Sequence, residues 1–214
     1  MFISLEGVDG SGKSTQAALL AEALGPDTVK IREPGGTDAA EAIRTILADP
    51  DIPLDPTAEL MLFFAARADL VRRVLRPALE AGRTVLSDRY VDSTEAYQGV
   101  ARGLGVEAVH DLNRIATGGL MPDLTVLIRV DPEIGLGRAR SGDRFEAEGL
   151  EFQRLVAGAY EEIARRETDR VVVVDGAGSP EEVHGRVLAV LAAAGVEPGA
   201  AGTPDSETGG GDAE

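Results

Sequence analysis

The chain has 214 residues, enough for one sizeable domain, and its 43% hydrophobic and 27% charged residues are ordinary for a soluble globular protein. A net charge of -16 argues against non-specific binding to nucleic acid, and the absence of cysteine excludes disulfides and thiolate metal sites. No apolar run approaches membrane-spanning length, and the first residues predict a strand instead of a signal peptide. We therefore expect a cytoplasmic protein without membrane contact.

Short β-branched runs alternate with longer helical patterns along the chain, which is typical of a parallel α/β sheet. Two runs, TVLI and VVVV, are continuously apolar, as strands covered on both faces should be. The predicted strands cover residues 2–6, 28–33, 84–88, 124–130 and 170–175. Helices are predicted from Lys13 onward and over 38–48, 57–81, 93–117 (broken around Gly103 and Gly105), 132–140, 149–167 and 180–194.

The composition changes at the end of the chain. Residues 196–214 are rich in Gly, Pro, Ala and acidic residues and contain no basic residue. Such a segment buries too little apolar area to order itself, so we expect a disordered tail. The remaining residues, 1–195, are expected to form a single domain.

Residues 7–14, GVDGSGKS, match the phosphate-binding pattern G-x-x-x-x-G-K-[ST] and lie between a predicted strand and a predicted helix. Glycines in this pattern let backbone N–H groups turn toward phosphate oxygens, and the helix N-terminus adds positive potential. Lys13 should reach the β- and γ-phosphates of a nucleoside triphosphate, and the Ser14 hydroxyl should bind Mg²⁺. The predicted triphosphate site comprises Gly7, Val8, Asp9, Gly10, Ser11, Gly12, Lys13, Ser14 and Thr15.

A phosphate loop alone is compatible with a GTPase switch, a motor ATPase or a small-molecule kinase. The Asn-Lys-x-Asp segment of the usual guanine-reading switch is absent, because the only lysines are Lys13 and Lys30 and the only asparagine is Asn113. A large motor needs a longer chain. A compact kinase is therefore the leading class.

Three further stretches follow or flank the predicted strands. Asp88 and Arg89 come at the carboxyl end of a strand, where open α/β sheets bind ligands, so Asp88 is placed to hold Mg²⁺ and Arg89 to bind a phosphate. An exposed Asp-Arg pair is the alternative.

The segment IREPGGT, residues 31–37, ends another strand and is also compatible with a simple turn. Phe63 and Arg67 lie four apart on one helix face, where periodicity alone predicts a core Phe and a surface Arg.

Together, the segments FISLEGVDGSGKSTQ, REPGGT, LFFAAR, SDRYVDSTEAYQG and RARSGDRFE closely resemble bacterial thymidylate kinases (dTMP kinases). The resemblance covers residues 1 to about 190 in order, and the phosphate loop combined with the DRY segment is specific to this family among nucleoside monophosphate kinases. It implies a P-loop NTPase fold: a five-stranded parallel sheet sandwiched by helices, with a mobile lid at about 138–149. It also implies a homodimer that transfers the γ-phosphoryl group of Mg·ATP to dTMP.

The resemblance implies a role for each residue around the acceptor base. Phe63 would stack on the thymine ring, and Arg67 would bond its O4 carbonyl. Thr94 and Gln98 would border the base and select the pyrimidine edge. Tyr97 would crowd the 2′ position of the sugar and so favour deoxyribose.

A second group of residues is implied for the acceptor phosphate and sugar. Arg89 would hold the phosphate, with Arg67 on the other side of the pocket and the turn formed by Glu33 and Pro34 beneath it. Asp9 would lie near the 3′-hydroxyl group and the water molecules around the metal.

Residues 135–149 contain three arginines within a short stretch and resemble the arginine-bearing lid of the bacterial enzymes. The resemblance implies that Arg140 and Arg144 close onto the transferred phosphate, where their planar fork spans two oxygens. Arg138 would pack on adenine or its phosphates, and Glu146, together with Asp143, would reach the acceptor side. The alternative is an exposed helix end whose arginines pair with the neighbouring acidic residues.

Phosphoryl transfer needs alignment, exclusion of water and positive charge, and no covalent protein chemistry. No general base is required, because a phosphate monoester with a second pKa of about 6 is largely dianionic at neutral pH. Gly10 stands where some thymidylate kinases carry an arginine, so the resemblance assigns the transition-state cation to the lid. The predicted catalytic residues are Asp9, Lys13, Arg89, Arg140 and Arg144.

Two alternatives stay open at this point. One is a sibling kinase that phosphorylates a different nucleotide or an unphosphorylated nucleoside. The other is a P-loop ATPase that drives a protein partner, although that function would leave the lid arginines and the DRY segment without a role.

Overall fold

The computed structural model describes residues 1–138 and 148–196. One sheet is formed by five parallel strands in the order β2-β3-β1-β4-β5. The strands are β1 (Phe2–Glu6), β2 (Val29–Arg32), β3 (Val85–Asp88), β4 (Leu124–Arg129) and β5 (Val171–Asp175). The predicted sheet is confirmed, and each strand end lies within one residue of its prediction.

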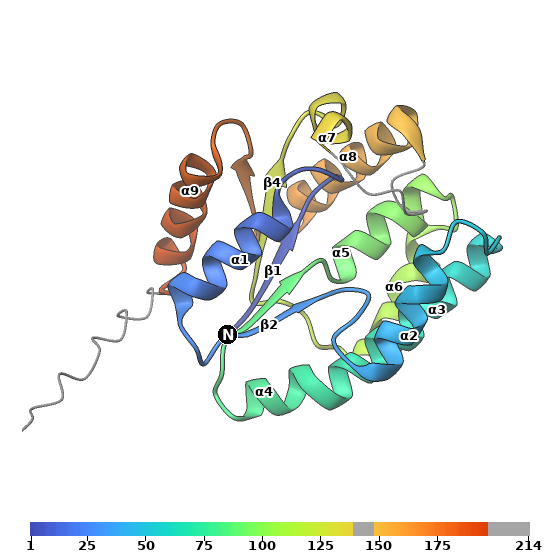
Figure 1. The fold of residues 1–214 in the computed structure, drawn as a ribbon, viewed down its shortest axis with the longest axis horizontal. Coiled ribbons are helices and arrows are strands. Elements are labelled where there is room, and N and C mark those ends of the chain that lie inside the picture. The colour runs from blue at the N-terminus through green and yellow to red at the C-terminus, as the bar shows by residue number, and fades with distance from the viewer. Residues whose placement is uncertain (139–147, 197–214) are drawn as a thin grey trace, which may run out of the picture.

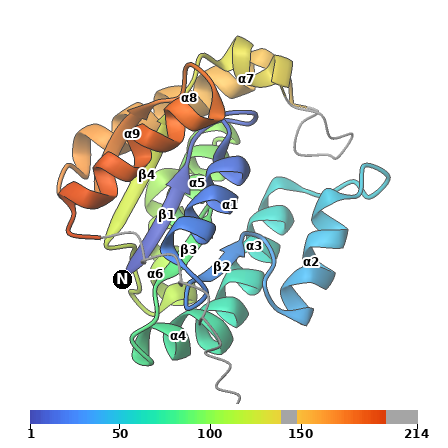
Figure 2. The ribbon, with the colours of Figure 1, turned by 60° about the vertical axis from the view of Figure 1, so that its left-hand side comes forward.

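Helices cover both faces of the sheet, so the molecule has three layers (Figure 1). On one face α1 and α9 lie side by side, as Figure 2 shows, and α8 packs on the other. The α-helices described are α1 (Lys13–Leu24), α2 (Asp38–Ala48), α3 (Pro56–Leu70), α4 (Arg76–Glu80), α5 (Val91–Thr94), α6 (Val106–Thr117), α7 (Pro132–Arg138), α8 (Gly149–Arg166) and α9 (Pro180–Ala193).

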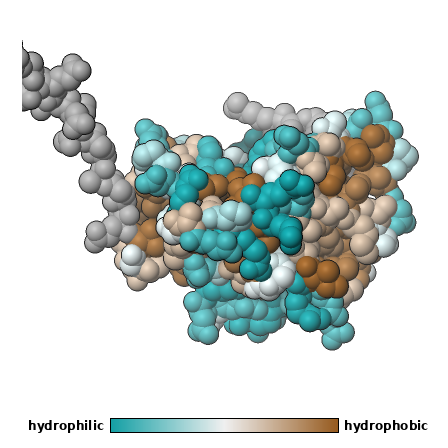
Figure 3. Space-filling view, turned by 90° about the horizontal axis from the view of Figure 1, so that it is seen from below, coloured by the Kyte–Doolittle hydropathy of each residue, from teal (hydrophilic) through white to brown (hydrophobic). Residues whose placement is uncertain are grey.

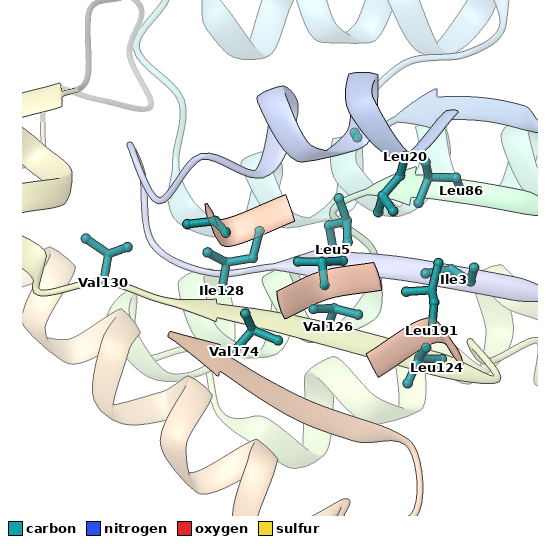
Figure 4. Packing of buried hydrophobic residues seen from close by; sticks show 13 residues of the cluster. Ile3, Leu5, Leu20, Leu86, Leu124, Val126, Ile128, Val130, Val174 and Leu191 are labelled. Carbon is teal, nitrogen blue, oxygen red and sulfur yellow. The ribbon is translucent and has the colours of Figure 1, made fainter. Parts of the chain in front are cut away.

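The largest buried cluster lies between the sheet and the α1–α9 layer (Figure 4). Ile3 and Leu5 of β1 pack there with Leu20 of α1 and Leu191 of α9. Leu127 of β4 instead packs in the cluster with α8, on the opposite face. Both faces of the central strands are therefore covered, which explains their uninterrupted apolar sequences.

Two of the predicted helical segments, 57–81 and 93–117, contain π-helical turns. Between α3 and α4 the chain forms the π-turn η1 (Val71–Leu75), directly before Pro77. Proline lacks an N–H group and its ring clashes with the preceding turn of an α-helix, and a wider turn accommodates both effects. A second π-turn, η2 (Glu95–Ala101), follows α5. The predicted break around Gly103 and Gly105 separates η2 from α6.

The topology gathers the functional motifs at one edge. After β3 the chain crosses β1 to form β4, so the strand order reverses at β1, where open α/β sheets bind ligands. The phosphate loop follows β1, and Asp88 ends the neighbouring β3. Within the described ranges, no helix is long and apolar enough to cross a membrane.

Candidate functional site

The phosphate loop joins β1 to α1 and presents the start of that helix without a side-chain cap. Gly12 precedes the helix at φ +95°, a conformation that favours glycine. The Lys13 Nζ donates hydrogen bonds to the carbonyl oxygens of Gly7 and Val8, at 2.9 and 2.7 Å. Burial, with the nearby Arg89 charge, lowers the pKa of Lys13 to about 8. The loop therefore offers uncapped N–H groups and a buried amine, as a phosphate site requires.

A cavity of about 650 Å³ opens beside the loop and is bordered by several elements. Of the predicted site residues, it is lined by Asp9, Gly10, Ser11, Gly12, Lys13, Ser14, Thr15, Glu33, Pro34, Phe63, Arg67, Asp88, Arg89, Thr94, Tyr97, Gln98 and Arg138. Gly7 and Val8 contribute the carbonyl groups that hold Lys13. The predictions for Arg140, Asp143, Arg144 and Glu146 fall outside the described residues. Sequences as far apart as the loop and α3 thus face one cavity.

Ser14 and Asp88, the two predicted metal ligands, lie in contact. The Ser14 hydroxyl donates to Asp88 Oδ2 at 2.5 Å. A hydroxyl and a carboxylate oxygen fit Mg²⁺, which binds proteins through one or two carboxylates and takes its remaining ligands from phosphates and water. In the described part of the chain, no group of three His, Cys, Asp or Glu side chains forms a fuller metal cage.

Arg89 lines the cavity and is held there by several side chains. Its Nη1 donates to Ser93 Oγ at 3.1 Å, its Nη2 donates to the Tyr97 hydroxyl at 3.1 Å, and it forms an ion pair with Asp9. Burial alone would lower the pKa of Arg89, but the neighbouring Tyr97 and Asp9 side chains raise it well above its usual range. The backbone of Arg89 adopts φ +72°, which is strained for a residue other than glycine and common at functional sites.

Asp9 faces Arg89 although it belongs to the phosphate loop. Its Oδ1 accepts from the Tyr97 hydroxyl at 3.0 Å and pairs with Arg89. Its Oδ2 accepts from Gln153 Nε2 at 2.6 Å, and its backbone N–H donates to Gln153 Oε1 at 3.2 Å. The Asp9 charge is therefore compensated inside the protein and does not oppose a bound triphosphate.

Gln153 of α8 was missed by the sequence analysis, although it makes both of these bonds to Asp9. Its side chain is 2% exposed, on the same buried helix face as Val156, Tyr160 and Ile163. A glutamine at an apolar position of an amphipathic helix was the available signal, because buried polar groups require hydrogen-bond partners.

Glu6 is a second missed residue, and its signal was a carboxylate in a strand covered on both faces. It is fully buried and accepts hydrogen bonds from Tyr90 N, Ser93 Oγ and the Tyr160 hydroxyl, at 2.7, 2.6 and 2.8 Å. Burial, followed by the charge of Asp92, raises the pKa of Glu6. Because Ser93 also accepts from Arg89, Glu6 supports the arginine from behind.

Arg67 is 2% exposed, so the surface position expected from periodicity alone is wrong. Its Nε and Nη2 pair with Glu33, and Nη2 also donates to the Tyr90 carbonyl at 3.0 Å. Its Nη1 donates to Thr94 Oγ1 at 2.8 Å and to Asn113 Oδ1 at 2.7 Å. These bonds use all five guanidinium N–H groups.

Glu33 completes this network from the end of β2. Burial raises its pKa, although the neighbouring Arg67 charge opposes the rise. Its Oε2 takes both contacts with Arg67, and Oε1 is the one buried side-chain oxygen or nitrogen of the described residues without a hydrogen-bond partner. IREPGGT is thus more than a simple turn, because it supplies a buried carboxylate to the cavity wall.

The phosphate loop packs directly against α7. A Cβ atom on Gly10, which lies at φ +69°, would overlap the carbonyl oxygen of Gly135. A Cβ atom on Gly135 would lie 2.5 Å from the carbonyl oxygen of Asp9. The position of Gly10 therefore has no room for a side chain.

We expect Gly135→Ala to lower the melting temperature and weaken triphosphate binding, because the new methyl group must displace the loop backbone. Such overpacking costs about 1–3 kcal/mol. Gly137→Ala, in the same helix with nothing within 4 Å of its Cβ, is the matched control and should be neutral or slightly stabilising. Thermal unfolding and nucleotide titration check this, and a Gly135→Ala protein as stable as the control would contradict the close contact.

The sequence and the fold were compared with those of known proteins. Residues 5–187 match the family model described as thymidylate kinase. A thymidylate kinase of Synechococcus sp. (strain JA-3-3Ab) is 50% identical over 194 residues, covering 89% of this chain and 95% of that protein. One from Kosmotoga olearia is 46% identical, covering 88% and 93%. The crystal structure of thymidylate kinase from Ehrlichia chaffeensis superposes with a TM-score of 0.77 at 33% identity, covering 89% of this chain and 98% of that one.

Proposed function

The chain belongs to the thymidylate kinase family and phosphorylates dTMP to dTDP with ATP as the donor, and we propose that the cavity described above binds both substrates. The observation that carries this proposal is the meeting of a phosphate loop, a Ser14–Asp88 pair and the half-buried Arg89 around one cavity. The alternatives of a sibling kinase and of a partner-driven ATPase are not supported, because the family is shown over most of the chain.

On the donor side, the loop from Gly7 to Thr15 binds the ATP phosphates through its N–H groups, and Lys13 bonds the β- and γ-phosphates. In the structure the Lys13 amine donates to carbonyl groups of the loop itself, so binding of a triphosphate would exchange these bonds for phosphate oxygens. Arg138, at the end of α7 and on the cavity wall, packs on adenine or its phosphates.

Ser14 and Asp88, which lie in contact, would hold Mg²⁺, with Asp88 acting directly or through water. When bound, this ion would neutralise charge on the phosphate oxygens. We expect Asp88→Asn to raise the Mg²⁺ concentration needed for half-maximal velocity about tenfold or more. The exposed Asp27→Asn, in the turn before β2, is the control. An unchanged magnesium requirement in Asp88→Asn would contradict the assignment.

On the acceptor side, Phe63 stacks on thymine and Tyr97 crowds the 2′ position of the sugar. The tyrosine is fixed in place because its hydroxyl lies between Asp9 and Arg89, at 3.0 and 3.1 Å. Asp9 lies near the 3′-hydroxyl group. These residues all line the same cavity.

Arg89 binds the acceptor phosphate, with the turn formed by Glu33 and Pro34 beneath it, while Arg140 and Arg144 bind the transferred phosphoryl group. Glu146 reaches the acceptor side. All five N–H groups of Arg67 are bonded within the protein. The proposed hydrogen bond from Arg67 to thymine O4 therefore requires one of these N–H groups to be shared between O4 and an acceptor in the protein, such as the Thr94 hydroxyl.

We also propose a homodimer built on the side of α3 and α6. Met61, Val100 and Ile115 are exposed there on neighbouring elements, and Ile115 is 74% exposed. Figure 3 shows apolar residues at the surface on this side of the molecule, at the right. Sedimentation at the mass of a single chain would contradict the dimer. The cytoplasmic location expected from the sequence stays a prediction.

A further inference from the structure

Thr94 and Gln98 lie four residues apart, at the junction of α5 and η2, and both face the cavity that Phe63 also lines. Side chains at this spacing stand next to each other on one side of a helix. They therefore present two polar groups, side by side, to whatever stacks on Phe63. The chemistry of the pair depends on how each group is oriented by the residues behind it.

The orientation of the Gln98 amide is set by Glu59 of α3. Gln98 Nε2 donates to Glu59 Oε1 at 3.1 Å, and Glu59 is 3% exposed. A carboxylate only accepts hydrogen bonds, so the amide cannot turn its oxygen toward Glu59 without placing two acceptors in contact. Gln98 Oε1 is thereby left to face the cavity, as a hydrogen-bond acceptor.

The orientation of the Thr94 hydroxyl is set by Arg67, which is a donor, whereas Gln98 is oriented by an acceptor. Its Oγ1 accepts from Arg67 Nη1 at 2.8 Å, and a guanidinium group only donates. The hydroxyl proton must therefore point away from Arg67. Thr94 presents a donor beside the acceptor of Gln98.

A donor beside an acceptor matches one kind of pyrimidine edge. Thymine and uracil carry the O4 acceptor next to the N3–H donor. Cytosine carries the reverse, an N4 amino donor next to the N3 acceptor, so it would meet both groups of the pair with the wrong polarity. A binding site that forms hydrogen bonds to its substrate rejects an analogue that cannot form them, because the buried polar groups of the site are then left unpaired.

We propose that Glu59 is a positioning residue that makes the pocket select keto pyrimidines over cytosine, because it holds the Gln98 oxygen toward N3 of the base. This inference rests on the proposed base site between Phe63 and the Thr94–Gln98 pair. Glu59 acts through Gln98 and does not itself line the cavity.

The test compares kcat/KM for dTMP and dCMP in wild type and in Glu59→Gln. A glutamine at this position keeps the shape but can donate as well as accept, so the Gln98 amide can turn over and offer its N–H₂ group to the base. We expect the ratio of dTMP to dCMP to fall at least about tenfold, the size of one mispaired buried group. Glu59→Asp, which still only accepts, should retain more of the ratio.

Arg102→Met is the matched control. Arg102 approaches both carboxylate oxygens of Glu59 at 3.4 Å, through Nε and Nη2, and has no hydrogen bond to Gln98 among those the structure shows. Its replacement should leave the ratio unchanged. Melting temperatures establish that all variants are folded.

An unchanged ratio in Glu59→Gln, with activity on both nucleotides reduced in parallel, would mean that Glu59 is only structural and would overturn the proposal. So would a wild-type enzyme that uses dTMP and dCMP equally well. A wild type inactive on dTMP would instead contradict the function itself. We expect dUMP, which has the same edge, to keep its rate relative to dTMP in Glu59→Gln.

Discussion

Replacing Arg89 by alanine should lower kcat/KM for dTMP by about 10²- to 10³-fold, the effect of removing one preorganised charged donor from an active site. The change removes the proposed ligand of the acceptor phosphate and also leaves Asp9, 9% exposed, without its cationic partner. Truncation of one member of such a buried pair is costly, because the other charge stays desolvated.

The variant Arg89→Lys distinguishes the contribution of the positive charge from that of the planar guanidinium group. Lysine retains the positive charge but lacks the planar fork that reaches Asp9, Ser93 and Tyr97 at once, so we expect most of the loss to persist. Arg165→Ala, on the exposed face of α8, is the control for loss of an arginine and should behave as wild type. Steady-state kinetics with dTMP measure the effect. An Arg89→Ala enzyme within about threefold of wild type would refute the role of Arg89 in phosphate binding.

Arg140→Ala and Arg144→Ala should each lower kcat by about 10³-fold or more, the contribution expected of an arginine at a transferring phosphoryl group. KM for dTMP should change little, because these side chains act on charge that develops during transfer. The described structure supports the need for such a cation. Gly10 has no space for a side chain, and α7, which packs on it, leads directly into residues 139–147.

The same kinetic experiment distinguishes the lid assignment from its alternative, an exposed helix end whose arginines pair with neighbouring acidic residues. If Arg140 and Arg144 only paired with neighbouring acidic residues, both alanine variants would turn over normally. A rise in KM with kcat preserved would place them at substrate binding instead. Only a fall in kcat with KM retained supports their assignment to the transition state.

The sequence predicted the elements whose signals are local. The phosphate loop is recognised from its own glycines and Lys13, and the strands from β-branched runs that need cover on both faces. Asp88 and Arg89 follow a predicted strand and both line the cavity, since the carboxyl ends of parallel strands meet at one edge. The choice of dTMP came from the family resemblance and not from these patterns.

What could not be predicted depends on contacts between distant parts of the chain. Arg67 is buried because Glu33, Asn113 and the Tyr90 carbonyl converge on it, and helical periodicity carries no information on such partners. Gln153 reaches Asp9 across 144 positions of sequence. The π-turns η1 and η2 also shift the helix face relative to a 3.6-residue repeat.

Asp9 shows how the structure changes the interpretation of a motif. A carboxylate in a phosphate loop seems to oppose its ligand, yet this one is directed to Arg89, Tyr97 and Gln153. We therefore propose that the loop serves two substrates. Its N–H groups and Lys13 would bind the donor, and its carboxylate organises the arginine assigned to the acceptor.

The most direct test of this account is ADP release with ATP, Mg²⁺ and a panel of dTMP, dUMP, dCMP and dGMP under identical conditions. We expect kcat/KM for dTMP to exceed that for dCMP and dGMP by at least about 10²-fold, because those bases leave buried polar groups unpaired. Turnover with dTMP no better than with dCMP or dGMP would contradict the central claim that this cavity is built for a keto pyrimidine monophosphate.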